Sequence, residues 1–310
     1  MLTKLAGAAA LIAAATGVAV ADDPKFEYGK KEAVKDPSGV EWKATAEAGA
    51  VFTTGNSENT NVTGGIKASR KEGDNKVSLE ASAAYAKSTV YTINDLNGNG
   101  VVDNDSELTT SEQITAETLY GKLRYDRFIT ETDSLYAAAV GARDVPAGKL
   151  AVYGGQAGYS RQLYKSPSAE TVGEIGYDYS HVHLVKGDPL DIHSVRAFVG
   201  HHATLTVGTV IDLSAEVLSN LNHLTLPTGQ DGSAFMDTRV NLKAAISAKI
   251  SPNLAVQTSF EARYDNRPAP LAIKNVMFAP GFVPAAQPLD TILKAQLIYT
   301  FAGTAEEKKK

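Results

Sequence analysis

The chain has no cysteine among its 310 residues. Disulfide frameworks, thiolate metal sites and cysteine nucleophiles are therefore excluded in any compartment. An excess of positive charge is also lacking, because 30 lysines and arginines face 35 aspartates and glutamates. Nucleic acids and anionic surfaces are bound through a basic face, so neither is expected as a partner.

Long apolar runs are scarce, and the one substantial run lies near the N-terminus between residues 5 and 20. A single positive charge, Lys4, precedes this run, and an A-x-A pattern closes it in front of Asp22. The run is shorter than the ~20 residues of a spanning helix, so the pattern predicts a cleaved signal peptide over 1–21. Cleavage would remove Lys4 and leave 29 basic against 35 acidic residues, a net charge of -6.

Apolar and polar residues alternate along most of the chain after residue 40, whereas helical periodicity is hard to find there. This alternation is typical of strands with two different faces. In 254–265, for example, one face carries Leu254, Val256, Thr258, Phe260, Ala262 and Tyr264. The pattern predicts strands near 41–52, 59–71, 76–91, 113–128, 135–142, 150–163, 171–181, 192–203, 207–220, 234–250, 254–265 and 289–301.

The connections between the predicted strands fall into two sets. One set is short, near 72–75, 130–134, 164–170, 204 and 251–253, and the alternate connections include the long segments 92–108, 183–190, 221–233 and 266–288. Short turns on one side and long loops on the other are typical of an outer-membrane barrel, whose termini are both periplasmic when the strand number is even.

We therefore expect an all-β fold, an antiparallel transmembrane β-barrel of about 12 strands over 41–301. A periplasmic segment over 22–40 would precede the barrel, and a polar tail over 302–310 would follow it. The stretch 135–142 is rich in alanine and its alternation is ambiguous, so the number of strands could be ten.

The last predicted strand ends in an aromatic residue, Phe301. A terminal strand of this kind resembles the signal read by the barrel-assembly machinery of outer membranes, which implies that machinery as a partner. The nine residues after Phe301 depart from the usual pattern, in which the aromatic residue is last.

Alternation alone does not decide which face of the strands points outward. In a soluble barrel the apolar face points inward, whereas in a membrane barrel it contacts lipid and the charged face lines the lumen. The signal peptide, the two sets of connections and the terminal aromatic residue all favour a monomeric barrel in outer-membrane lipid. The alternative is a soluble secreted β-barrel that binds a ligand.

Several short motifs agree in order with one family. The opening run Thr53-Thr54-Gly55-Asn56, preceded by Trp42 and Gly49, resembles the start of the salt-stress-induced outer-membrane protein family. Further matches are Tyr125-Asp126-Arg127-Phe128, Arg143-Asp144, Gly158-Tyr159, Tyr264, Pro268, Asp290, Tyr299 and Phe301. The resemblance covers roughly residues 40 to 301 and implies an outer-membrane β-barrel with no established reaction.

A twelve-stranded outer-membrane barrel can be an enzyme, and outer-membrane phospholipase A is the relevant comparison. A serine and a histidine that act together on one strand face need a spacing of two. Here Ser180-His181 and His193-Ser194 are adjacent, so their side chains are expected on opposite faces. A lipid hydrolase is therefore the less favoured alternative, and we expect no catalytic residues and no enzymatic activity.

Five histidines could be imagined as a metal cluster. His181 and His183 share a strand face, but two ligands do not make a site. We expect exposed or interfacial histidines near strand ends instead. The five are His181, His183, His201, His202 and His223.

The predicted connection 92–108 contains a candidate Ca²⁺ site. Its segment 95–103 reproduces the first nine positions of the D-x-[DN]-x-[DN]-G calcium loop, with glycine at the sixth. The twelfth position, where a bidentate glutamate is expected, holds Ser106, so Glu107 would have to reach the ion by a shift of one residue. The alternative is a turn rich in Asp, Asn and Gly. The predicted ligands are Asp95, Asn97, Asn99, Val101 through its carbonyl, Asp103 and Glu107.

Two functions remain open, a narrow passive pore for small solutes and a role in envelope structure and stress adaptation. A barrel of ~8 strands is filled by side chains and one of ~16 to 18 leaves a channel, so about twelve strands lie between these limits. Opposite charges on the inner face could either pair across a closed lumen or line a narrow wet one. Because the two signs are mixed, we expect at most a small and weakly selective conductance.

Overall fold

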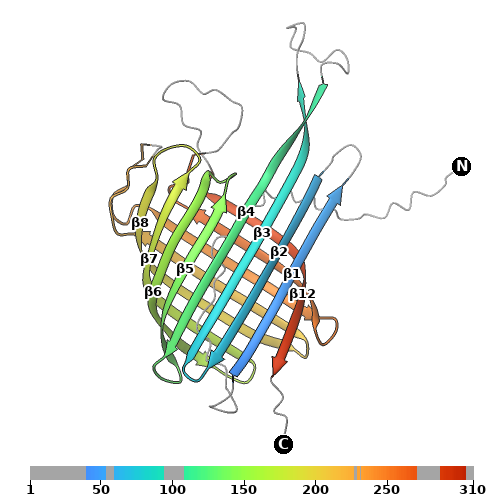
Figure 1. Ribbon diagram of the computed structural model, residues 1–310, viewed down its shortest axis with the longest axis vertical. Coiled ribbons are helices and arrows are strands. Elements are labelled where there is room, and N and C mark those ends of the chain that lie inside the picture. The colour runs from blue at the N-terminus through green and yellow to red at the C-terminus, as the bar shows by residue number, and fades with distance from the viewer. Residues whose placement is uncertain are drawn as a thin grey trace, which may run out of the picture.

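A computed structural model describes residues 40–53, 59–93, 108–226, 229–230, 232–270 and 287–304 of the chain. These residues form a closed barrel of twelve antiparallel strands, in which each strand pairs with the next and β1 pairs with β12 (Figure 1). The strands are β1 Val40–Thr53, β2 Asn59–Glu72, β3 Asn75–Ile93, β4 Leu108–Phe128, β5 Asp133–Asp144, β6 Lys149–Lys165, β7 Ala169–Leu184, β8 Leu190–Thr206, β9 Thr209–Asn220, β10 Thr238–Lys249, β11 Leu254–Asp265 and β12 Leu289–Thr304.

The prediction of an all-β antiparallel barrel is confirmed, and the number of strands is twelve rather than ten. The ambiguous alanine-rich stretch forms β5. Two boundaries differ from the expected ones for a backbone reason. β10 begins at Thr238 and not near 234, because Phe235 has a φ of 65° that an extended strand cannot hold, and the bend expected near Thr204 lies at Gly208, whose φ is 97°.

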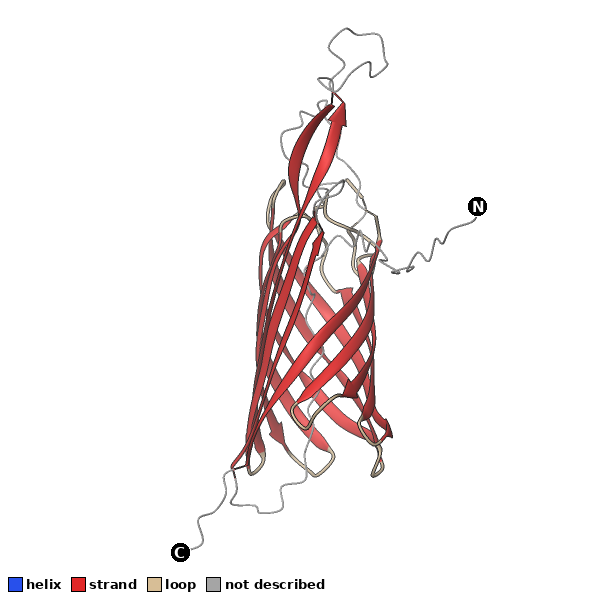
Figure 2. Ribbon diagram, turned by 90° about the vertical axis from the view of Figure 1, so that its right-hand side faces the viewer, coloured by secondary structure: helices blue, strands red, loops and turns tan. Residues whose placement is uncertain are grey.

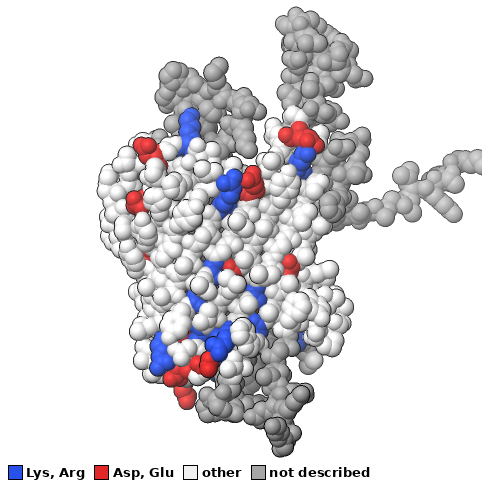
Figure 3. Space-filling model, in the orientation of Figure 1, with Lys and Arg blue, Asp and Glu red and all other residues white. Residues whose placement is uncertain are grey.

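Most exposed large side chains of the strands are apolar and point outward, whereas the buried charged ones point into the lumen. On β11, Val256, Phe260 and Tyr264 are exposed, while Glu261 and Arg263 between them are buried. This is the arrangement expected for a barrel in lipid and the reverse of a soluble barrel. Uncharged side chains make up most of the strand surface visible in Figure 3. The described residues contain no helix long and apolar enough to cross a membrane.

The connections at the two ends of the barrel differ in length less evenly than expected, because the β5–β6 connection has only four residues and the β7–β8 connection only five, although both lie opposite the shortest turns. Five of them, between β2 and β3, β4 and β5, β6 and β7, β8 and β9, and β10 and β11, are two to four residues long, and we call their end the turn end (Figure 2). β1 begins and β12 ends at the turn end. The remaining connections lie at the opposite end, the loop end.

The chain that follows β11 reaches across the loop end. A Cβ atom built on Gly148, in the turn between β5 and β6, would lie 2.5 Å from the carbonyl oxygen of Pro270. β11 and β5 stand on opposite sides of the ring. The segment 266–270 therefore crosses the opening of the lumen and packs on the far wall, which needs a glycine there.

Candidate functional site

Six side chains form a hydrogen-bonded network inside the barrel, which we call the charged belt. They come from β4, β5, β7, β8 and β9 and so reach around half of the ring. Each points inward because it alternates with an outward apolar neighbour, as Arg124 does with Leu123. The members of the charged belt are Arg124, Asp126, Tyr136, Glu174, Arg196 and Glu216.

Two arginines and one carboxylate make the centre of the charged belt. Arg124 binds Glu174 through two nitrogens, at 2.8 and 3.2 Å, and also contacts Asp126 at 2.7 Å. Arg196 donates to Glu174 at 2.7 Å and forms a second ion pair with Glu216. Bidentate ion pairs of this kind are strong and directional, so the four strands that supply them are linked across the lumen.

Tyr136 lies between the two arginines. The guanidinium of Arg124 is 4.2 Å from the centre of its ring, and Arg196 donates to its hydroxyl group at 2.9 Å. Two glycines on β6 and β7, the next two strands of the ring, make room for the tyrosine hydroxyl group. A Cβ atom on Gly158 or Gly176 would lie 2.8 or 2.6 Å from that hydroxyl oxygen.

The charged belt is closed to water. Arg196 and Asp126 are 0 % exposed, and Arg124 and Glu216 are 1 % exposed. Lumen-facing groups in a wet channel would be accessible, so side chains fill this part of the lumen. On the β10 to β12 side, Glu261 binds Arg263 at 2.9 Å, Lys243 at 3.1 Å and Lys294 at 3.5 Å. Charges of opposite sign thus pair in the lumen instead of lining it singly.

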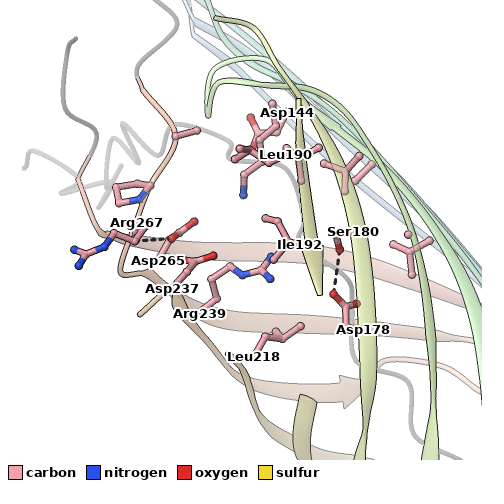
Figure 4. A pocket seen from close by; sticks show the side chains of 18 of the residues that line it. Asp144, Asp178, Ser180, Leu190, Ile192, Leu218, Asp237, Arg239, Asp265 and Arg267 are labelled. Atoms are coloured by element: carbon pink, nitrogen blue, oxygen red, sulfur yellow. Dashed lines mark hydrogen bonds between the residues drawn. The ribbon is translucent and has the colours of Figure 1, made fainter. Parts of the chain in front are cut away.

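A chamber opens between the charged belt and the loop end. Gln156, Asp178, Glu216 and Asn241 line its deep part. The turn and loop segments that close over it include Leu226 and the chain from 267 to 269. Figure 4 shows Asp237, Arg239, Asp265 and Arg267 on one side of the chamber, Asp178 with Ser180 on the other, and Ile192 and Leu218 between them.

One wall of the chamber is apolar, although it faces the lumen. Val182, Leu184 and Ile192 pack with Leu224 from the connection after β9, and all four are less than a tenth exposed. Sequence reasoning missed this wall. Val182 and Leu184 have the same strand parity as the inward Ser180, so the alternation could have shown that the inner face turns apolar near the loop end.

Two buried oxygen atoms in the chamber have no hydrogen-bond partner among the described residues, Oδ1 of Asp237 and Oε1 of Gln156. Each residue is 4 % exposed. Asp237 precedes β10, and its burial raises the pKa of its carboxyl group above the usual range, an effect that the neighbouring Arg239 opposes. An acceptor buried in this way is costly unless something donates to it.

The predicted metal and export residues are not part of this site. Asp95, Asn97, Asn99, Val101, Asp103 and Glu107 of the calcium loop, and the signal peptide over 1–21, lie outside the described residues. Among the residues that are described, no group of three or more His, Asp or Glu side chains is placed to hold a metal ion.

The serines and histidines considered for catalysis lie on opposite faces, as their adjacent positions predicted. Ser180 donates to Asp178 inside the barrel, and Ser194 is buried there. The outward histidines have partners of their own, His181 with Asp191 at 2.7 Å and with His183 at 3.1 Å. The others are spread out: His201 contacts Thr171, His202 contacts Asp212, and His223 is exposed in the connection after β9.

A family model described as "Protein of unknown function, DUF481" matches residues 46–301. This range spans ten complete strands, β2 to β11, together with most of β1 and β12 up to Phe301. No curated protein sequence matches the chain.

Solved structures of barrels are similar to this chain at very low identity. The NanC porin is 8 % identical over 84 % of this chain and 99 % of its own, with a TM-score of 0.42. The translocator domain of the autotransporter NalP from Neisseria meningitidis is 11 % identical over 87 % and 90 %, with a TM-score of 0.40. The TodX monoaromatic hydrocarbon channel, as a deletion mutant, is 9 % identical over 86 % and 91 %, with a TM-score of 0.41. These likenesses assign no ligand or activity to this chain.

Proposed function

Because the chain belongs to the family described as a protein of unknown function, DUF481, and folds as a closed barrel, we propose that it is an outer-membrane protein of low conductance. In this proposal it is not an enzyme. Small solutes enter the chamber from the loop end, which faces outward, and the charged belt restricts their passage toward the turn end. Both chain termini then lie in the periplasm.

The observation that carries the proposal is the burial of the charged belt. Its ion pairs hold β4, β7, β8 and β9 together, and the side chain of Arg196 at their centre is fully buried. A permanently open porin keeps its lumen charges hydrated and spaced for ion passage. Opposed charges that pair across the lumen favour a narrow or intermittent path instead.

An envelope role in stress adaptation is the second candidate. The charged belt would then stiffen the barrel by linking its strands, and no solute would need to pass through the lumen. The resemblance to the salt-stress-induced outer-membrane protein family supports this reading, as does the network of paired charges within the lumen. Measurement of solute passage distinguishes the two.

Purified protein in a planar lipid bilayer is expected to show at most small and weakly selective currents. The protein should require detergent for extraction, begin at Asp22 and shift its gel migration on boiling, because a closed strand ladder resists unfolding. Large currents with strong selectivity for one sign would contradict the proposal, and recovery as a soluble periplasmic protein would remove its basis. Complete absence of current would favour the envelope role.

Two partners follow from the same proposal. Outer-membrane lipid covers the apolar outer face, where Leu293 and Leu297 of β12 are more than half exposed. The barrel-assembly machinery reads the last strand through Phe301, which is also exposed on that strand. We propose that the protein is a monomer, so that lipid alone covers its apolar outer face.

The calcium loop adds a separate proposal for segment 95–107. We expect Ca²⁺ to bind the folded protein weakly, on the order of 10⁻⁴ to 10⁻³ M, because two of the ligands are neutral amides. Isothermal titration calorimetry of the folded barrel is compared with a variant that carries Asp95→Ala and Asp103→Ala. Heat of binding that is identical in both proteins would leave only a turn in this segment.

A further inference from the structure

We propose that the loop-end chamber binds a small organic amine, with its ammonium group at Asp237 and its apolar body against Val182, Ile192 and Leu218. This inference deepens the proposed function and rests on it in one respect, that the chamber opens to the outer solution. Three independent features of the chamber point to this ligand class.

The first feature is the hydrogen-bonding demand of the chamber. Gln156 donates through Nε2 to Asp178 at 3.0 Å. A carboxylate only accepts, so the amide cannot be turned around, and its Oε1 must remain the atom without a partner. Oδ1 of Asp237 is a second buried acceptor without a partner. A ligand that satisfies both atoms must carry hydrogen-bond donors, which a carboxylate group in its charged form does not.

The second feature is charge. Glu216 is already paired with Arg196 in the charged belt, so it is left out of the balance. Among the described residues, the remaining titratable side chains that line the chamber are four carboxylates and three basic groups, which together carry one net negative charge when all of them are ionised. A singly charged cation therefore balances the chamber. The carboxylates are Asp144, Asp178, Asp237 and Asp265, and the basic groups are Lys149, Arg239 and Arg267.

The third feature is the apolar wall opposite the charges. Val182 and Ile192 are 4 % and 6 % exposed, and Leu218 is 6 % exposed, at the edge of the same chamber. A hydrated metal ion would gain nothing from these side chains, whereas an apolar ligand body placed against them removes its own surface from water. Figure 4 shows Ile192 and Leu218 between the two polar sides, and both line the same chamber as Asp237.

Burial and charge act together at Asp237. Because burial raises the pKa of this carboxyl group, its charged form is disfavoured in the empty chamber. An ammonium group beside it stabilises the charged form. A small organic amine therefore supplies in one molecule the hydrogen-bond donor, the positive charge and the apolar body that match the three features of the chamber.

The test is a titration of the full-length folded barrel in detergent with benzylamine. Calorimetry measures the heat and the affinity of binding. Benzyl alcohol, which has no charge, and benzoate, which has the opposite charge, are titrated in parallel. A charge-assisted hydrogen bond contributes enough for about tenfold tighter binding of benzylamine than of benzyl alcohol. Equal affinity for the amine and the alcohol, or preference for benzoate, would overturn the proposal.

Variants locate the amine within the protein. Asp237→Asn keeps the shape of the side chain and is expected to weaken benzylamine at least about tenfold while leaving benzyl alcohol unchanged. Gln156→Leu, which removes the second acceptor, should weaken the amine as well. Asp74→Asn alters the formal charge equally at an exposed turn on the turn end and should have no effect. Benzylamine binding that survives Asp237→Asn would contradict the assignment.

The readouts separate this inference from the proposed function. Amine binding in a protein that passes no current would contradict the pore and leave the chamber site standing. Small currents without any amine binding would contradict the chamber site and leave the pore standing. A shift of gel migration on boiling that is the same in every variant as in the parent protein shows that each variant is folded.

Discussion

Arg196→Met is expected to lower the free energy of unfolding by about 3 to 5 kcal/mol, the usual cost of removing one partner from a buried ion pair. Arg196 is fully buried and bridges Glu174 and Glu216, which would keep their charges with one partner fewer. Urea unfolding of the refolded barrel, followed by tryptophan fluorescence or gel migration, measures the change. The same variant should raise single-channel current, since the bridge between the strands is gone.

Arg161→Met is the matched control. Its side chain is 59 % exposed on β6 and lies 3.7 Å from Asp133 at the turn end. Exposed ion pairs contribute about 1 kcal/mol or less, so this variant should differ little from the parent in stability and in current. Equal losses in the two variants would show that the charged belt contributes no more than a surface pair.

Gly176→Ala is expected to cost about 1 to 3 kcal/mol, the range for overpacking a filled interior. The added Cβ atom would lie 2.5 Å from the backbone oxygen of Ala157 and 2.6 Å from the hydroxyl oxygen of Tyr136. Either β6 and β7 separate or the tyrosine moves away from Arg124 and Arg196. Urea unfolding reports the loss, and bilayer current reports whether the charged belt has opened.

A second substitution tells which of these contacts matters. Tyr136→Phe removes the hydroxyl group, so in the Gly176→Ala background it should restore part of the lost stability, whereas alone it only costs the hydrogen bond to Arg196. Gly141→Ala is the control, because a Cβ atom there meets nothing within 4 Å. That change should be neutral or slightly stabilising. A loss at Gly141 as large as that at Gly176 would refute the steric explanation.

The strands and their faces follow from the sequence alone. Period-two alternation depends on neighbouring residues, and it correctly puts Glu261 and Arg263 on one face and Phe260 and Tyr264 on the other. The closed barrel shows that the charged face is the inner one. The ends of strands are less well determined, because a single backbone angle, such as that of Phe235, decides them. The alternation left the number of strands at ten or twelve, because the alanine-rich stretch 135–142 shows little contrast between its two faces. Its pairing with β4 and β6 shows that this stretch is a strand, β5.

The site depended on the tertiary structure. Alternation places Arg124, Glu174 and Arg196 on the inner face but does not say which of them meet. Glu174 is 50 residues from Arg124 and 22 from Arg196, and only closure and tilt of the barrel bring their charged groups within 3 Å. The chamber arises in the same way, because its polar and apolar sides come from strands on different parts of the ring. Local sequence determines which way a side chain points, whereas pairing across a lumen is a property of the closed ring.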